Sequence, residues 1–295
     1  MPQKIPVRSG SPASGTLPTS EAESRDYLLS LCWPHGEALC PRCSHRKIYS
    51  LSGRRMRCAS CKYTFREFSG RWLNNGGLAC SEWVALIKLF AEEKSVRRMT
   101  ELLGLSHNTV YKALTAVRFS ILAHALDAPQ FLGPRTGLNS YLKGNRLTGG
   151  PKDMSMDTIP VYGILEKNGW VFIDLVPGLQ AETVFHFHLN FHLKLVRSGN
   201  LVYTDRYREY DAMLFCGNDT LPYDCIRYYS APARIDAMDS QFWAFARNRL
   251  KRFRGIPRRR FPLYLKELEF RFNNREQDLF PLLAQRLCGL VQEYC

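Results

Sequence analysis

Apolar and polar residues follow different patterns in different parts of the chain. Residues 81–126 have few helix breakers apart from Gly104, which predicts a helical segment. The runs 159–165 and 170–176 are rich in β-branched and aromatic residues, and the turn sequence 167–169 between them predicts a hairpin. Downstream we expect a helix over 183–196, a strand over 200–204, and helices over 236–254 and 261–272. This order predicts an α/β fold in which helices pack on a mixed sheet.

The start of the chain and the region before the first hairpin lack such periodicity. Residues 1–24 are dominated by Pro, Ser, Gly and Thr, so we expect a disordered leader, followed by a short helix over 27–33. Residues 129–153 are loaded with Gly, Pro, Asn and Lys, which predicts a linker or an irregular segment.

Two C-x-x-C pairs, Cys40 with Cys43 and Cys58 with Cys61, are separated by 14 residues. This spacing is typical of two knuckles that complete a structural Cys₄ zinc site, and the β-type residues between the pairs fit a short hairpin, as in a zinc ribbon. A redox role is the alternative, but redox C-x-x-C motifs normally occur once, after a strand. The other six cysteines lack such pairing and are expected to be small buried apolar residues.

Residues 95–114 have the pattern of a helix-turn-helix, with Gly104 in the turn and Ser106 as the N-cap of the second helix. Val96, Met99, Leu102, Leu103, Val110 and Leu114 are the expected contacts between the two helices. Four residues would then face DNA from the start of the second helix: His107, Asn108, Thr109 and Lys112. The alternative is an ordinary αα-hairpin.

Charge narrows the class of partner. The 295 residues carry a formal net charge of +14, which favours a polyanion. No apolar run approaches the ~20 residues that span a bilayer, and no signal peptide is visible, so we expect a cytoplasmic protein without disulfides. Residues 25–77 and 247–295 hold most of the surplus, whereas 128–246 have eleven basic against twelve acidic residues.

The densest basic run lies between 247 and 260, with eight basic residues in fourteen, and we interpret it as a phosphate-binding edge. Its members are Arg247, Arg249, Lys251, Arg252, Arg254, Arg258, Arg259 and Arg260. Asp205 directly follows the strand-like run 201–204, where a carboxylate is either a Mg²⁺ ligand or a turn residue. Asp236 and Asp239 lie in the first turn of a predicted helix and are either ligands or favourable acids at its N-terminus.

Taken together, these motifs resemble the bacterial insertion-sequence transposases related to the Merlin superfamily. The resemblance covers most of residues 38–283, and its most specific parts are 159–165, 202–205 with Tyr210, 241–246, 249–257 and 263–273. It implies a ribonuclease-H-like mixed sheet with flanking helices behind the zinc ribbon and helix-turn-helix. The expected domains are a leader (1–24), the zinc ribbon (25–77), the helix-turn-helix (78–127), and the core with its basic C-terminal helices (128–295).

In this family, two Asp and a Glu or Asn bind Mg²⁺ for cleavage of the transposon end and attack of the freed 3′-hydroxyl on target DNA. Asp205 matches the second Asp, and Asp239 fits the third position if the turn before its helix has gained a residue. The family's first Asp precedes Glu-x-Tyr-Phe-Gly, and the counterpart here, 137–144, has Leu138 at that position. A hydrocarbon cannot ligate Mg²⁺; the carboxylates that could substitute are Asp153, Asp157 and Asp174.

The sequence therefore predicts a transposase-like protein on double-stranded DNA, with structural Zn²⁺ and, for an active core, catalytic Mg²⁺. We expect it to act at the bacterial nucleoid, as a homodimer or a higher oligomer on DNA. The alternative is a transposase-derived DNA-binding regulator or architectural protein without catalysis. A zinc-ribbon RNA-binding protein is the third hypothesis.

Overall fold

The computed structural model describes most of the first 125 residues and separate segments of the remainder. The described residues are 17–34, 36–75, 77–125, 161–167, 169–175, 195–198, 201–204, 211–215, 241–250, 256 and 260–291. The chain divides into two compact units. The first comprises residues 1–124 and 277–292, and the second comprises 125–276 and 293–295.

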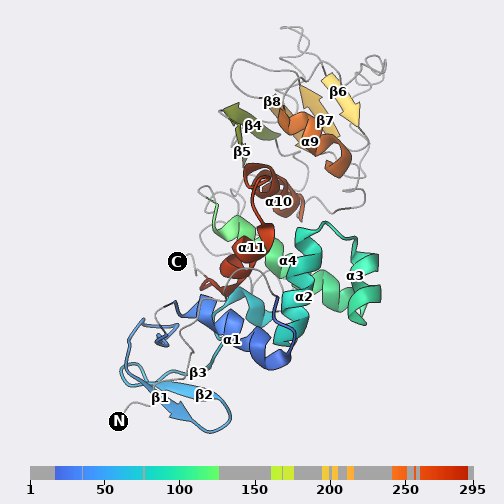
Figure 1. Ribbon diagram of the computed structural model, residues 1–295. Helices are drawn as coiled ribbons and strands as arrows, with labels where there is room; N and C mark the ends of the chain where they lie inside the picture. The colour runs from blue at the N-terminus through green and yellow to red at the C-terminus, as the bar shows by residue number, and fades with distance from the viewer. Residues whose placement is uncertain are drawn as a thin grey trace. The chain divides into compact units, whose positions relative to one another are not determined.

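The first unit contains a small antiparallel sheet of three strands in the order β1-β2-β3 (Figure 1). Its strands are β1 (Ile48–Leu51), β2 (Arg55–Cys58) and β3 (Thr64–Arg66). The hairpin expected between the cysteine pairs is confirmed as β1 and β2, and β3 adds a strand that the sequence did not predict. Left-handed backbone at Gly53 (φ 69°) and Arg54 (φ 58°) makes the turn of the hairpin.

Helices form the rest of the first unit. They are α1 (Glu21–Cys32), the 3₁₀ helix η1 (Trp72–Asn75), α2 (Cys80–Ala91), α3 (Val96–Leu103), α4 (His107–Ala123) and α11 (Leu279–Cys288). The core contains Trp72, which stacks on Phe119 with ring centroids 6.2 Å apart, and the fully buried Trp83. Every residue of α4 from Ala113 to Ala123 is buried, so only the first turns of this helix reach solvent.

The start of α1 corrects one expectation from the sequence. The helix begins at Glu21, so the last four residues of the expected leader are helical. Ser20 Oγ accepts a hydrogen bond from the N–H of Glu23, and the Glu23 carboxylate accepts one from the N–H of Ser20. This capping box satisfies free N–H groups of the first turn and overrides the loop-like composition before it.

Helix α11 lies far along the sequence, within the range expected for the core, yet it packs in the first unit. Phe280 stacks on Tyr27 of α1, with ring centroids 5.9 Å apart. The buried Arg71 guanidinium donates to the carbonyl oxygens of Cys288 and Cys32, at 2.7 and 2.9 Å. The N–H of Val291 donates to the carbonyl of Gly70. The last described helix is therefore part of the N-terminal core.

In the second unit, five described strands form a sheet in the order β5-β4-β8-β7-β6. They are β4 (Val161–Lys167), β5 (Trp170–Leu175), β6 (Leu195–Ser198), β7 (Leu201–Thr204) and β8 (Asp211–Phe215). The predicted β4–β5 hairpin is confirmed, and the strand predicted over 200–204 is confirmed as β7 over its described residues. The helix expected over 183–196 is wrong at its end, because residues 195 and 196 belong to β6; residues 183–194 lie outside the described segments.

All the pairings among these five strands are antiparallel. The structure is α/β, as predicted, but the expected mixed sheet is wrong for the described strands, which form an antiparallel sheet. The ribonuclease-H-like fold of the core stays a prediction. Two helices accompany the sheet: α9 (Gln241–Leu250) and α10 (Phe261–Asn273), both close to their predicted ranges. They pack through Phe242 and Phe245, whose rings each meet the ring of Phe272 edge-on at 5.4 Å.

Helix α10 also covers the edge of β5. The side chain of Asn273 accepts from the N–H of Val171 and donates to its carbonyl, at 2.8 and 2.7 Å. One turn earlier, Glu269 accepts from the N–H of Ile173 at 2.7 Å and pairs with the buried Lys266. Because β5 is the edge strand, these contacts satisfy backbone groups that the sheet leaves unpaired.

In the parts of the chain that the structure describes, no helix is long and apolar enough to cross a bilayer.

Candidate metal centre and nucleic-acid interface

The two cysteine pairs are held in loops with the same backbone geometry. The residue after the second cysteine of each pair, Ser44 or Lys62, adopts a left-handed conformation, with φ of 56° and 59°. The chain then turns so that the next backbone N–H, of His45 or Tyr63, donates to that cysteine's sulfur. The carbonyls of these same two residues accept from the N–H of the first cysteine of each pair, at 3.1 and 3.0 Å.

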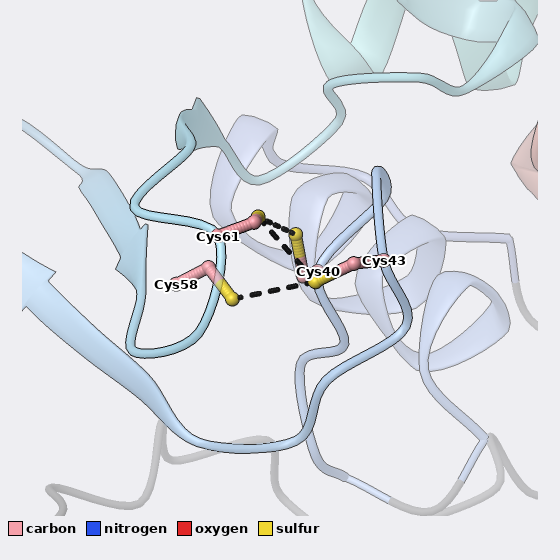
Figure 2. Close-up of side chains that lie close together, drawn as sticks. All are labelled: Cys40, Cys43, Cys58 and Cys61. Atoms are coloured by element: carbon pink, nitrogen blue, oxygen red, sulfur yellow. Dashed lines mark hydrogen bonds between the residues drawn. The ribbon is translucent and has the colours of Figure 1, made fainter.

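The loops bring all four sulfurs together (Figure 2). The sulfurs of Cys40, Cys43, Cys58 and Cys61 all lie within 4.8 Å of one another. The contacts Cys40–Cys61, Cys43–Cys58 and Cys43–Cys61 measure 3.5, 3.6 and 3.4 Å. Four Zn–S bonds of ~2.3 Å at tetrahedral angles would separate the sulfurs by ~3.8 Å. The arrangement fits a structural zinc ion, as the spacing of the cysteines predicts.

The pKa values of two thiols in this cluster, those of Cys43 and Cys61, are shifted in opposite directions. The N–H of Tyr63 lowers the pKa of Cys61 to about 7, with further help from the neighbouring thiols that donate to it. The N–H of His45 works in the same direction on Cys43, but hydrogen bonds with the other cysteines and desolvation raise the pKa of Cys43 to about 12. Cys61 is therefore more acidic than Cys43, and binding of a divalent cation by four thiolates would release protons from the cluster.

The surroundings of the cluster are strongly basic. Residues 38–68 contain eight basic residues and one acidic residue, Glu67. That carboxylate is engaged by Arg25 of α1, whose Nε donates to it at 3.0 Å. The positive charge of the ribbon is therefore uncompensated within the ribbon itself, which favours an anionic partner.

The helix pair α3–α4 has the caps that the sequence predicts. Ser95 accepts from the N–H of Arg98, and Ser106 accepts from the N–H of Thr109 at 3.1 Å. Gly104 ends α3 in the left-handed region, with φ of 65°. One expected interhelical contact is wrong: Leu102 is 48% exposed. It falls on the outer side of α3, whereas Met99 is buried.

Of the four residues expected to face DNA, His107, Asn108 and Lys112 are exposed. Thr109 is half-buried, and its hydroxyl bonds to the Ser106 hydroxyl at 2.9 Å. His107 stacks on Tyr111, with ring centroids 6.2 Å apart. These exposures are compatible with a recognition helix, and DNA reading by this helix pair stays a prediction.

The predicted catalytic residues Asp205 and Asp239 lie outside the described residues, as does Leu138 at the position of the family's first Asp. Most of the basic run lies outside them too: Lys251, Arg252, Arg254, Arg258 and Arg259. Arg247 is part of α9, and Arg260 precedes α10 and is half-buried. Arg249 donates to the carbonyl of Phe245, with its guanidinium 3.6 Å from the centre of that ring.

Other features of the site were not predicted from the sequence. The N–H groups of His45 and Tyr63 were missed, although each stands two residues after the second cysteine of a pair, where zinc knuckles place such donors. The alternation of Arg55, Met56 and Arg57 was a further signal, because it determines which side chains share one face of the sheet. Of the unpaired cysteines, Cys32, Cys80 and Cys288 are buried, as expected.

Comparisons with known proteins agree with this site. Residues 19–64 match a transposase zinc-ribbon domain, and residues 130–273 match the ISXO2-like transposase domain. An uncharacterized transposase-like protein of Haemophilus influenzae is 32% identical over 120 residues, which is 40% of this chain and 94% of that relative. This chain belongs to the insertion-sequence transposase family. All four cysteines of the cluster lie inside the region that matches the zinc-ribbon domain.

No solved structure matches the chain. Membership of the family therefore rests on the sequence matches, and the zinc ribbon is supported in addition by the geometry of its four sulfurs. The second match, 130–273, includes α9 and α10 and ends at the last residue of α10.

Proposed function

We propose that this protein binds the duplex DNA at the ends of its insertion sequence and cleaves and joins strands there. The observation that carries the proposal is the zinc ribbon, in which four clustered cysteines lie within residues 38–68, a segment with eight basic residues and one acid. Family membership supplies the substrate, because transposases act on DNA. We expect a protein that acts on DNA to be found at the bacterial nucleoid, and we propose that a homodimer or higher oligomer holds two transposon ends.

For the chemical step, we propose that the carboxylates of Asp205 and Asp239 hold Mg²⁺. Bound there, the ion would polarise a phosphoryl oxygen and stabilise the charge that develops on it. The protein's own part is to bring the scissile phosphate to these carboxylates and to keep the duplex in place with cationic side chains. The basic segment 247–260, which begins in α9, is our candidate for that second task.

A specific observation favours a second function. Leu138 stands where the family has its first Asp, and a hydrocarbon side chain supplies no oxygen ligand. A transposase-derived DNA-binding regulator or architectural protein needs the ribbon and the helix pair but not the carboxylates. The two functions share the same DNA contacts and differ only in whether strands are cut.

The test is strand cleavage of a duplex that carries the end sequence of the protein's own element, with Mg²⁺ or Mn²⁺. For the enzyme we expect cleavage that Asp205→Ala reduces by a factor of at least about 100, because electrostatic stabilisation of the phosphate is lost. The exposed Asp26 of α1 provides the control, since Asp26→Ala should cut at the wild-type rate.

Binding is measured in the same samples. Binding by wild type and Asp205→Ala without any cleavage would reject the enzyme and support the regulator. If the protein prefers RNA to duplex DNA of the same length, both proposals fail and the RNA-binding hypothesis replaces them.

A further inference from the structure

The register of the ribbon sheet sorts its side chains onto two faces. Met56 of β2 stands opposite Phe65 of β3, and both side chains are buried, with exposures of 3% and 4%. This pair marks the inner face. In a β-sheet, residues directly opposite one another share a face and neighbours along a strand alternate, so the flanking rows belong to the outer face.

The outer face consists of two rows of three residues. One row runs from Tyr49 through Arg57 to Thr64, and the other from Leu51 through Arg55 to Arg66. All six side chains are exposed, and Tyr49 and Leu51 are 49% and 40% exposed. The face is therefore cationic at its centre, with one aromatic and one aliphatic side chain on β1.

The placement of the three arginines is unfavourable for the isolated ribbon. Arg55 and Arg66 stand directly opposite each other, and like charges in such a cross-strand pair destabilise a sheet. Arg57 lies two residues from Arg55 on the same strand, ~7 Å away. Among the residues that the structure describes, no carboxylate pairs with any of the three; Arg55 donates only to the carbonyl and hydroxyl of Ser52.

The one acid of the ribbon does not relieve this repulsion. Glu67 directly follows β3 but pairs with Arg25 of α1. A sheet that places two arginines side by side, with a third next to them, gains most from a ligand that carries regularly spaced negative charge. Arginine is also the side chain best suited to bidentate contact with phosphate oxygens.

We propose that the outer face of the ribbon sheet binds duplex DNA by lying across its phosphate backbone. Arg55, Arg57 and Arg66 contact phosphates, and Tyr49 and Leu51 rest against the sugars. The proposal rests on the proposed function, because it identifies the surface of the same DNA-binding protein that grips the backbone.

The width of the sheet favours binding to the phosphate backbone of DNA over insertion into the major groove. The major groove is about 12 Å wide and admits a two-stranded ribbon. Here β3 pairs along β2, so the axes of the outer strands lie about 10 Å apart before side chains are added. The ribbon should therefore contribute affinity without sequence preference, and base reading is left to the first turn of α4.

The experiment measures the affinity of full-length, zinc-loaded protein for two duplexes, the end of the element and a scrambled sequence, over a range of salt concentrations. Arg55→Gln combined with Arg57→Gln should weaken binding to both duplexes equally, by at least about tenfold at low salt. Each lost phosphate contact should reduce the slope of log K against log salt by about 0.9, so the double variant should lose about 1.8.

Two matched variants isolate the contribution of the face. Lys88→Gln with Lys94→Gln removes the same charge from the α2 region, where both lysines lie beside Glu92, and should leave the slope nearly unchanged. Arg55→Lys with Arg57→Lys keeps the charge and should restore the wild-type slope. Zinc content and circular dichroism confirm that each variant is folded.

The outcomes separate the two levels of the proposal. If wild-type protein does not bind duplex DNA, the proposed function fails. If wild type binds and the glutamine variant keeps its affinity and salt slope, the outer face is not the contact surface, although the function stands. If the glutamine variant loses affinity for the end sequence of the element but not for the scrambled duplex, the outer face reads bases, and the proposal that it contacts only the backbone is overturned.

Discussion

Ser44 and Lys62 show how much a single backbone conformation controls in the metal centre. Neither is a glycine, yet both adopt positive φ, which costs an ordinary side chain roughly 1 kcal/mol. The turn that each residue makes directs the next backbone N–H at a cysteine sulfur and places that sulfur next to the sulfurs of the other three cysteines. We expect that metal binding by the four sulfurs stabilises the two bent loops and so offsets this strain.

Replacement of one ligand tests this cluster. Cys43 is exposed, so Cys43→Ser removes a thiolate without leaving a cavity in the core. We expect the dialysed variant to hold less than a tenth of the wild-type zinc, because a neutral hydroxyl is a far weaker zinc ligand than a thiolate. Loss of the metal should unfold the ribbon, since a structural zinc site of this kind contributes on the order of 10 kcal/mol.

Zinc is quantified by elemental analysis, and the sheet is followed by circular dichroism. Cys80→Ser, which changes a buried cysteine outside the cluster, is the control and should retain one zinc per chain. Full zinc occupancy in Cys43→Ser would contradict the four-cysteine site.

Some elements depend on hydrogen bonds from residues that are distant in the sequence. Strand β5 lies at the edge of its sheet, and α10 supplies Asn273 and Glu269, four residues apart on one side of the helix, to its free backbone groups. The buried Val171 and Ile173 pack under this helix, while Trp170 and Phe172 alternate with them and are exposed. The side chains of α10 thus form hydrogen bonds with β5 that a neighbouring strand would otherwise form.

Asn273→Ala should destabilise the second unit by about 1–3 kcal/mol, because it leaves an N–H and a C=O of Val171 without partners. Urea unfolding measures the free energy, and hydrogen exchange at the Val171 amide locates the effect. Glu276→Ala, at an exposed residue just beyond α10, is the control and should change stability by less than about 0.5 kcal/mol. Unchanged protection of the Val171 amide in Asn273→Ala would show that the side chain does not cap this strand.

At the scale of the whole molecule, the chain returns to its N-terminal unit after the core. Leu283 and Leu287 of α11 are completely buried. Arg71 donates hydrogen bonds to the last residue of α11 and to the last residue of α1. The N-terminal core therefore requires residues from both ends of the described chain. The chain between them, 125–276, is joined to the first unit at two points.

Leu283→Ala should lower the stability of the first unit by about 2–5 kcal/mol, the cost of a buried leucine and the cavity that it leaves. Leu290→Ala, two residues beyond the end of α11 and 41% exposed, is the matched control. Thermal unfolding followed by the fluorescence of the buried Trp72 and Trp83 reports on this unit. Equal melting temperatures for the two variants would show that α11 does not stabilise the N-terminal core.

Local signals account for most of what the sequence predicted correctly. The cysteine spacing identified the metal centre, and Gly104 and Ser106 identified the end of α3 and the start of α4. The β-branched and aromatic runs with the turn sequence 167–169 between them identified the β4–β5 hairpin. Each depends on residues close together in the chain. The start of α1 was also readable, because Ser20 and Glu23 form a capping box, but the polar composition before it concealed the signal.

Family membership could be recognised from the sequence, since motifs such as the cysteine pairs and the segment 263–273 are linear patterns. Only the tertiary structure showed that α11 belongs to the N-terminal core, that Asn273 caps β5, and that three arginines share the outer face of the ribbon. These features depend on strand register and on contacts between residues far apart in the sequence, such as Arg71 and Cys288, which are separated by 217 positions. Such contacts leave no periodicity in the sequence, because they are selected by the packing of complete elements.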